Sequence, residues 1–79
     1  MPQLLFVHRY QVYETVAHNN IQIEALLALK QSGMFEFWTN IRFGRFIDIM
    51  TPPKRINQLI EFLTVNGISH RLKISNVQE

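Results

Sequence analysis

Two spacings of apolar residues recur along this chain, and each predicts a different element. Residues 11–16 read Gln-Val-Tyr-Glu-Thr-Val, a run rich in β-branched and aromatic side chains that predicts a strand. Residues 34–39 and 45–50 predict two further strands, joined by a turn over residues 40–44. From Ile68 to Ile74 apolar residues and His70 alternate with Ser, Arg and Lys, which predicts a half-buried fourth strand.

A first amphipathic helix is expected between the first two strands. Its cap is Asn19 or His18, and Asn19 followed three residues later by Gln22 has the spacing of a capping box. Gly33 is expected to end the helix, because glycine readily adopts the left-handed conformation found there. The residues expected on its buried face are Ile23, Leu26, Leu27 and Leu29.

A second amphipathic helix is expected before the last strand. Thr51 would be its N-cap and Pro52 its first residue, where a missing N–H costs nothing. The sequence Asn66-Gly67 supplies a left-handed stop. A clear 3.6-residue stripe predicts the buried face: Ile56, Leu59, Ile60 and Leu63.

The resulting order, β-α-β-β-α-β, predicts an α+β fold of the ferredoxin-like type. Two helices would cover one face of a four-stranded antiparallel sheet and leave the other face open, as an open-faced sandwich. Residues 1–79 are expected to form a single domain, with residues 1–9 as an N-terminal arm and residues 10–78 as the globular part. Residues 4–7 would either extend the first strand or belong to that separate arm.

Composition adds several exclusions. The chain has 79 residues, 47% of them apolar and 18% charged, which suits a small folded domain rather than a disordered one. It has no cysteine, so disulfides and thiolate metal sites are excluded. No apolar run approaches the roughly 20 residues of a membrane span, and the first residues do not fit a signal peptide. The net charge of +2 is only weak support for an acidic partner.

No pattern of reactive side chains predicts catalysis. His8, His18 and His70 are scattered, and none has a second ligand at metal spacing. No serine lies in a nucleophile elbow, and the three glycines are too far apart for a phosphate loop. The six acidic residues show no pairing in the sequence. We therefore expect a non-enzyme with no catalytic, cofactor or metal site.

The basic residues leave an RNA-binding or ligand-binding ferredoxin-like module as an alternative. Arg42 and Arg45 flank the turn, and Arg71 and Lys73 are expected on the polar side of the last strand. The sequence from Arg42 to Ile49 matches the RNA-recognition signature of a third strand at its first position and at Phe46-Ile47. It lacks the required glycine and stacking aromatics, so this alternative ranks second. A designed or excised domain with no retained activity is the third.

An ordered set of short motifs resembles the activation segment of pancreatic-type zinc carboxypeptidase precursors. The resemblance covers about residues 10–78, and it is the order and spacing of the pieces that make it specific. The matching pieces are Tyr10-Gln11-Val12-Tyr13, Gln22 with Leu26-Leu27 and Leu29, Phe37-Trp38, Pro52-Pro53, Phe62-Leu63 with Gly67-Ile68, and Ile74 with Asn76-Val77-Gln78.

The resemblance implies a prosegment that inhibits a zinc carboxypeptidase and assists its folding. The partner would be the cognate carboxypeptidase domain, attached in a secreted precursor, with no membrane or nucleic acid involved. In that family the open sheet face and the loop after the tryptophan lie over the active-site cleft. The partner-binding residues expected here are Trp38, Ile41, Arg42, Phe43 and Arg45.

Two features of this region bear on that expectation. Trp38 could instead be a core anchor, because aromatic residues dominate cores as well as interfaces. The loop from Thr39 to Arg45 is shorter than usual in vertebrate members of the family. It also carries Arg42 and Arg45 where an acidic residue of some relatives pairs with a substrate-binding arginine of the enzyme.

Overall fold

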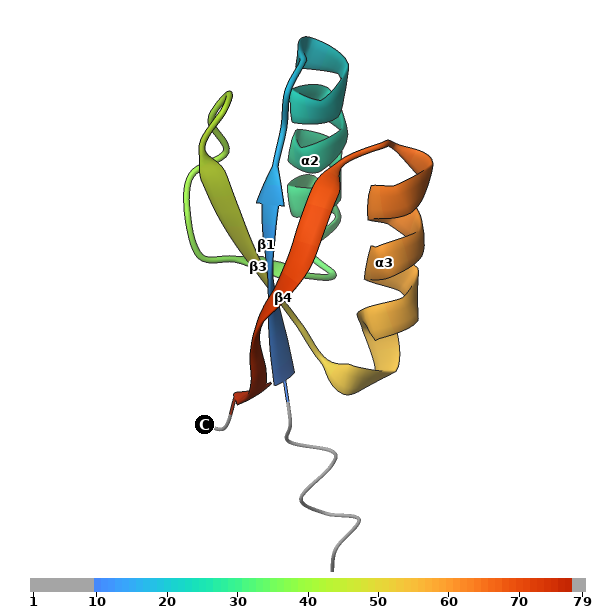
Figure 1. The fold of residues 1–79 in the computed structure, drawn as a ribbon. Coiled ribbons are helices and arrows are strands. Elements are labelled where there is room, and N and C mark those ends of the chain that lie inside the picture. The colour runs from blue at the N-terminus through green and yellow to red at the C-terminus, as the bar shows by residue number, and fades with distance from the viewer. Residues whose placement is uncertain (1–9, 78–79) are drawn as a thin grey trace, which may run out of the picture.

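The computed structural model describes residues 10–77, with side chains placed for residues 10–73. A four-stranded sheet lies against two helices (Figure 1). The elements follow in the order β1 (Tyr10–Val16), α2 (Asn20–Ser32), β2 (Glu36–Phe37), β3 (Phe46–Thr51), the 3-10 helix η1 (Pro53–Arg55), α3 (Ile56–Val65) and β4 (Ser69–Val77). The expected arm, residues 1–9, lies outside the described residues.

The strand order confirms the predicted topology. The sheet runs β2-β3-β1-β4, and every neighbouring pair is antiparallel. The two long central strands pair from Gln11 opposite Thr51 to Val16 opposite Phe46. Because side chains alternate between faces along a strand, this register decides which residues of β1 and β3 share a face.

A single hydrophobic core lies between the sheet and the helices. The fully buried members from α2 and α3 are Leu26, Leu59 and Leu63, and they meet Ile47 and Ile49 of β3. Both helices contribute to the same cluster, so both cover the same face of the sheet, as Figure 1 shows. Among the described residues, no helix covers the other sheet face, which is called the open face below.

The first helix begins and ends where the sequence predicts. The Asn19 side chain accepts a hydrogen bond from the Gln22 N–H at 2.8 Å, and Gly33 closes the helix with a φ of 76°. Gln22 reaches back to the His18 N–H rather than to that of Asn19, one residue beyond a standard capping box. Leu27 was expected to be buried, but it is 42% exposed, because the buried stripe runs through Leu26 and Leu29 instead.

Gln22 also joins α2 to the second half of the chain. It is buried, and its side-chain amide donates to the carbonyl of Gly67 at 2.8 Å and to that of Asn66 at 3.3 Å. These carbonyls belong to the turn between α3 and β4, where Gly67 adopts a φ of 68° as predicted. One polar side chain therefore links the start of α2 to the end of α3.

The start of the second helix differs from the prediction. Thr51 is the last residue of β3, and its hydroxyl donates to the Pro52 carbonyl instead of capping a helix. Pro52 is extended, with φ −69° and ψ 158°, because a residue before a proline is pushed out of the helical region. Pro53 therefore takes the first helical position, and α3 follows at Ile56. The predicted stripe faces the core, with Leu59 and Leu63 fully buried and Ile56 and Ile60 partly buried against the core.

The second strand is shorter than predicted, two residues instead of six. Trp38 still donates its backbone N–H to the Asp48 carbonyl at 2.8 Å. The next ladder position is lost because the Asp48 N–H donates to the Thr39 hydroxyl rather than to a backbone carbonyl. Arg45 was placed in the third strand, but its N–H closes the turn by donating to the Arg42 carbonyl.

The fourth strand begins one residue later than predicted and continues to Val77. Its pairing with β1 shifts register between Val12 and Tyr13, which leaves Lys73 between the paired residues Leu72 and Ile74. Ile68 is buried as expected, whereas Leu72 is 48% exposed despite its predicted inward position. Leu72 lies in an edge strand, where one flank has no neighbouring strand to cover it.

Candidate functional site

The open face carries an acidic residue in the middle of each central strand. Glu14 of β1 lies directly opposite Asp48 of β3, so two carboxylates occupy neighbouring positions on one face. Like charges in such a pair repel and destabilise a sheet unless cations compensate them. Both residues are nearly buried, at 9% and 8% exposed.

The edge strand β4 supplies the two compensating cations. Arg71 donates from Nε to Glu14 Oε1 at 2.7 Å, and Lys73 donates from Nζ to Asp48 Oδ2 at 2.8 Å. The register shift beside Lys73 brings both cations onto the open face within three residues of β4. These four residues, Glu14, Asp48, Arg71 and Lys73, are called the charge cluster below.

Burial makes the accessible part of the charge cluster positive. The side chains of Glu14 and Asp48 are 10% and 12% exposed, whereas that of Arg71 is 75% exposed. Lys73, at 42%, also reaches solvent. Lysine is charged at neutral pH, and the hydrogen bond to Asp48 raises the pKa of the Lys73 ammonium further above neutrality. A partner approaching this face therefore meets cations first.

One acceptor in the charge cluster lacks a donor. Asp48 Oδ1 is buried and has no hydrogen-bond partner among the described residues, while Oδ2 is held by Lys73. A buried acceptor without a donor costs free energy, on the order of 1–3 kcal/mol. Buried polar atoms in folded proteins are nearly always paired, so Asp48 Oδ1 is an exception in the part of the chain that the structure describes.

Exposed aromatic side chains lie beside the charge cluster. Phe46 is 63% exposed, although it begins a central strand, and Trp38 is 45% exposed after the end of β2. Trp38 is outside the hydrophobic core cluster, so the alternative that it anchors the core is wrong. Large exposed apolar side chains grouped on one face are typical of a surface that binds a partner.

The loop between β2 and β3 exposes three of the expected partner-binding residues. The Gly44 N–H donates to the Ala17 carbonyl at 3.0 Å. Gly44 has a φ of 70°, a backbone conformation that would be strained for a residue with a side chain. Arg42, Phe43 and Arg45 are exposed around this turn, with Phe43 at 64%. Ile41 was expected to be exposed by the turn, but it is partly buried and packs against the core.

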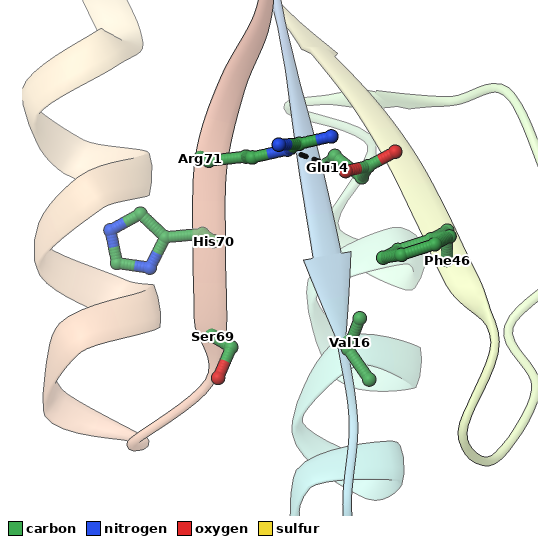
Figure 2. Close-up of a pocket in the computed structure, with 6 residues that line it drawn as sticks. All are labelled: Glu14, Val16, Phe46, Ser69, His70 and Arg71. Carbon is green, nitrogen blue, oxygen red and sulfur yellow. Dashed lines mark hydrogen bonds and ion pairs between the residues drawn. The ribbon is translucent and has the colours of Figure 1, made fainter.

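A shallow hollow of about 330 Å³ opens on the sheet beside the charge cluster. Figure 2 shows Arg71 reaching from β4 across β1 toward Glu14, with Phe46 of β3 pointing toward the same space. His70 lies on the α3 side of β4, and its Nδ1 is 2.9 Å from the Ile68 carbonyl. The residues that line the hollow are Glu14, Val16, Phe46, Ser69, His70 and Arg71.

The sequence did not predict the charge cluster as a site. Arg71 and Lys73 were expected on the polar side of β4, which is confirmed, but their partners were not identified. A signal was present, because Glu14 and Asp48 each interrupt an otherwise apolar or β-branched strand. An acidic residue in such a run needs a partner when it is buried, and the sequence alone did not say which one.

Two further observations concern the part of the chain that the structure describes. Within residues 10–77, no three histidine, cysteine or acidic side chains are grouped so that they could hold a metal ion. No helix in that range has the length and apolar character needed to cross a membrane.

Comparison with a family model gives a match over most of the chain. Residues 13–79 match the family described as carboxypeptidase activation peptide. The matched range includes both helices, three of the four strands in full and all but the first residues of β1. No protein in the curated collection matches significantly.

Solved structures show the same fold. A chain from the crystal structure of carboxypeptidase A from Helicoverpa armigera superposes with a TM-score of 0.79, at 20% identity over 86% of this chain. The crystal structure of thrombin activatable fibrinolysis inhibitor gives a TM-score of 0.75, at 14% identity over 82% of this chain. The match spans 17% and 18% of those two chains, so the protein described here corresponds to a small part of each.

Proposed function

This chain belongs to the carboxypeptidase activation peptide family, and we propose that it is a prosegment that inhibits a zinc carboxypeptidase by covering its active-site cleft. A role in folding the attached enzyme belongs to the same proposal. The covering surface would consist of the open face together with the loop that follows Trp38. The chain itself would have no catalytic activity.

One observation carries the proposal beyond family membership. The open face leaves large apolar side chains and charged groups uncovered, including Trp38 and Phe46, while the opposite face is covered by both helices. Binding a partner over this face would remove that apolar surface from water, at about 25 cal/mol per Å². Phe43 and Arg42 at the loop tip would extend the contact beyond the sheet.

The proposed partner is the cognate zinc carboxypeptidase domain, joined to this segment in a secreted precursor. The two structural relatives named above, carboxypeptidase A and thrombin activatable fibrinolysis inhibitor, have chains much longer than this segment. Secretion of the precursor is part of the same proposal and rests on membership of the family alone.

The test is inhibition of the mature cognate carboxypeptidase by the added 79-residue chain. We expect inhibition that rising substrate concentration overcomes, because the chain and the substrate would compete for the same cleft. Arg42→Ala/Phe43→Ala should weaken inhibition while leaving the thermal unfolding temperature nearly unchanged, because both residues are exposed.

Ile41 is left intact in that variant because it packs against the core. The matched control is Ile21→Ala, which removes an exposed apolar side chain from α2, one of the two helices on the covered face of the sheet. Equal inhibition by the wild type and the loop variant would exclude the loop as the blocking element. Absence of inhibition by the wild type would contradict the proposed function as a whole.

A further inference from the structure

We propose that the hollow on the open face binds an acidic side chain, Asp or Glu, of the carboxypeptidase, through the guanidinium of Arg71. The inference rests on the proposed function, because it names the chemistry of one contact between prosegment and enzyme. It concerns a part of the sheet that is separate from the loop residues expected to face the cleft.

Arg71 has hydrogen-bonding capacity that the fold does not use. A guanidinium carries five N–H donors, and only Nε is bonded to a side chain among the described residues, to Glu14 at 2.7 Å. The four N–H groups on the two terminal nitrogens are left over. The Arg71 side chain is 75% exposed, so these donors are available to a group that arrives from solvent.

The bond to Glu14 prepares Arg71 for this task. Glu14 is buried and accepts a hydrogen bond from Arg71 Nε. This bond restrains the Arg71 side chain, which would otherwise lose rotamer freedom on binding a partner. Such prior ordering lowers the cost of association. Figure 2 shows the guanidinium lying beside Glu14, and both residues line the hollow. The terminal nitrogens can then form the paired, parallel hydrogen bonds with which arginine holds a carboxylate.

The remaining walls of the hollow suit the stem of an acidic side chain. Val16 and Phe46 provide apolar surface, and Ser69 also lines the hollow. A methylene stem would rest against the apolar walls while the carboxylate meets Arg71. The volume of about 330 Å³ is large enough to admit an acidic side chain.

Charge decides between an acidic and a basic occupant. The two carboxylates of the charge cluster are buried beneath cations that are far more exposed, so the accessible field is positive. Lys73 is a second exposed cation beside Arg71 and adds to the attraction for an anion. A basic side chain would meet Arg71 and Lys73 before it could reach either carboxylate.

The experiment compares Arg71→Gln with Glu14→Gln in the inhibition assay, using the full 79-residue chain and the mature cognate carboxypeptidase. If Arg71 binds a carboxylate of the enzyme, Arg71→Gln should raise the inhibition constant about tenfold, the size of one charge-assisted hydrogen-bonded contact. Glu14→Gln should raise the constant much less, because Arg71 stays in place and the amide oxygen of Gln can still accept from its Nε. Added salt should narrow the difference between the wild type and Arg71→Gln.

A purely structural role for the ion pair gives a different pattern. Both variants would then weaken inhibition alike, in parallel with a lowered unfolding temperature, and that result would overturn the proposal. Equal inhibition by Arg71→Gln and the wild type would overturn it as well, while leaving the proposed function standing. If Arg71→Gln does not fold, Arg71→Lys keeps the charge but loses the paired donors, and inhibition as strong as that of the wild type would then count against the proposal.

Discussion

The helix-covered face and the open face belong to the same strands, yet different interactions stabilise them. On the covered face, Ile47 and Ile49 of β3 are fully buried against Leu59 and Leu63 of α3. On the open face, the residue between those two isoleucines is Asp48, which depends on Lys73 from another strand. Because side chains alternate between the two faces, one face is stabilised by non-directional apolar burial and the other by specific hydrogen bonds and ion pairs.

The two faces differ in how well they can bind a partner without loss of the fold. Apolar burial is roughly proportional to area, so the covered face gains stability from close packing. The open face keeps a pair of opposed carboxylates and a buried acceptor without a donor, both of which oppose folding. A sheet that keeps such groups on only one face is suited to binding through that face.

The largest expected effect is on the covered face. Leu59→Ala should lower the free energy of unfolding by about 2–5 kcal/mol, because Leu59 is fully buried and its removal leaves a cavity. Val65→Ala in the same helix is the matched control, because Val65 is 76% exposed and should change stability by no more than about half a kcal/mol. Urea unfolding measures both, and similar losses from the two variants would contradict the assignment of the core.

The open-face ion pair should matter less than the core. Lys73→Met should lower the free energy of unfolding less than Leu59→Ala does, because Lys73 reaches solvent, although the Asp48 that loses its partner is nearly buried. In an Asp48→Asn background the same change should cost little, since no buried charge is left without a partner. A double-mutant cycle in urea measures the coupling, and additive effects would show that the pair contributes nothing beyond its separate members.

The smallest expected effect is a loss of stability at alkaline pH caused by Tyr13, a residue of the core on the covered face. Burial raises the pKa of the Tyr13 hydroxyl above its ordinary value of 10.0. The unfolded chain therefore releases this proton at lower pH than the folded chain. The contribution of Tyr13 to the free energy of unfolding is complete below about pH 10 and is lost as the pH rises further. Wild-type stability should fall relative to Tyr13→Phe above that pH. A constant difference from pH 8 to pH 11 would show that Tyr13 is not the group involved.

Local signals in the sequence predicted the local features of the fold. The stripe from Ile56 to Leu63, the cap at Asn19 and the stops at Gly33 and Gly67 depend on residues within a few positions of one another. Leu27 was assigned to the wrong side of its helix because neighbouring leucines fit several stripes equally well. Pro52 was expected at the first helical position, but Pro53 takes that position because a residue before a proline disfavours the helical conformation.

The candidate site depends on contacts that are distant in sequence. Arg71 bonds Glu14 across 57 residues and Lys73 bonds Asp48 across 25, and neither separation leaves a pattern in the chain. The register shift beside Lys73, which places both cations on the open face, depends on the pairing of β1 with β4. The exposed loop residues Arg42, Phe43 and Arg45 were identified because a turn exposes its tip, and the inward orientation of Ile41 required the core to be known.

The Gln22 side chain has a consequence for how fast this chain folds and unfolds. Its amide bonds close loops of 44 and 45 residues, so they can form only when α2 and the turn before β4 have already come together. A contact with such a large loop-closure cost is expected late, after the rate-limiting step. Gln22→Met should therefore speed unfolding and leave the folding rate nearly unchanged. In stopped-flow kinetics, a slower folding limb would instead place this bond in the folding nucleus, which would then span both halves of the chain.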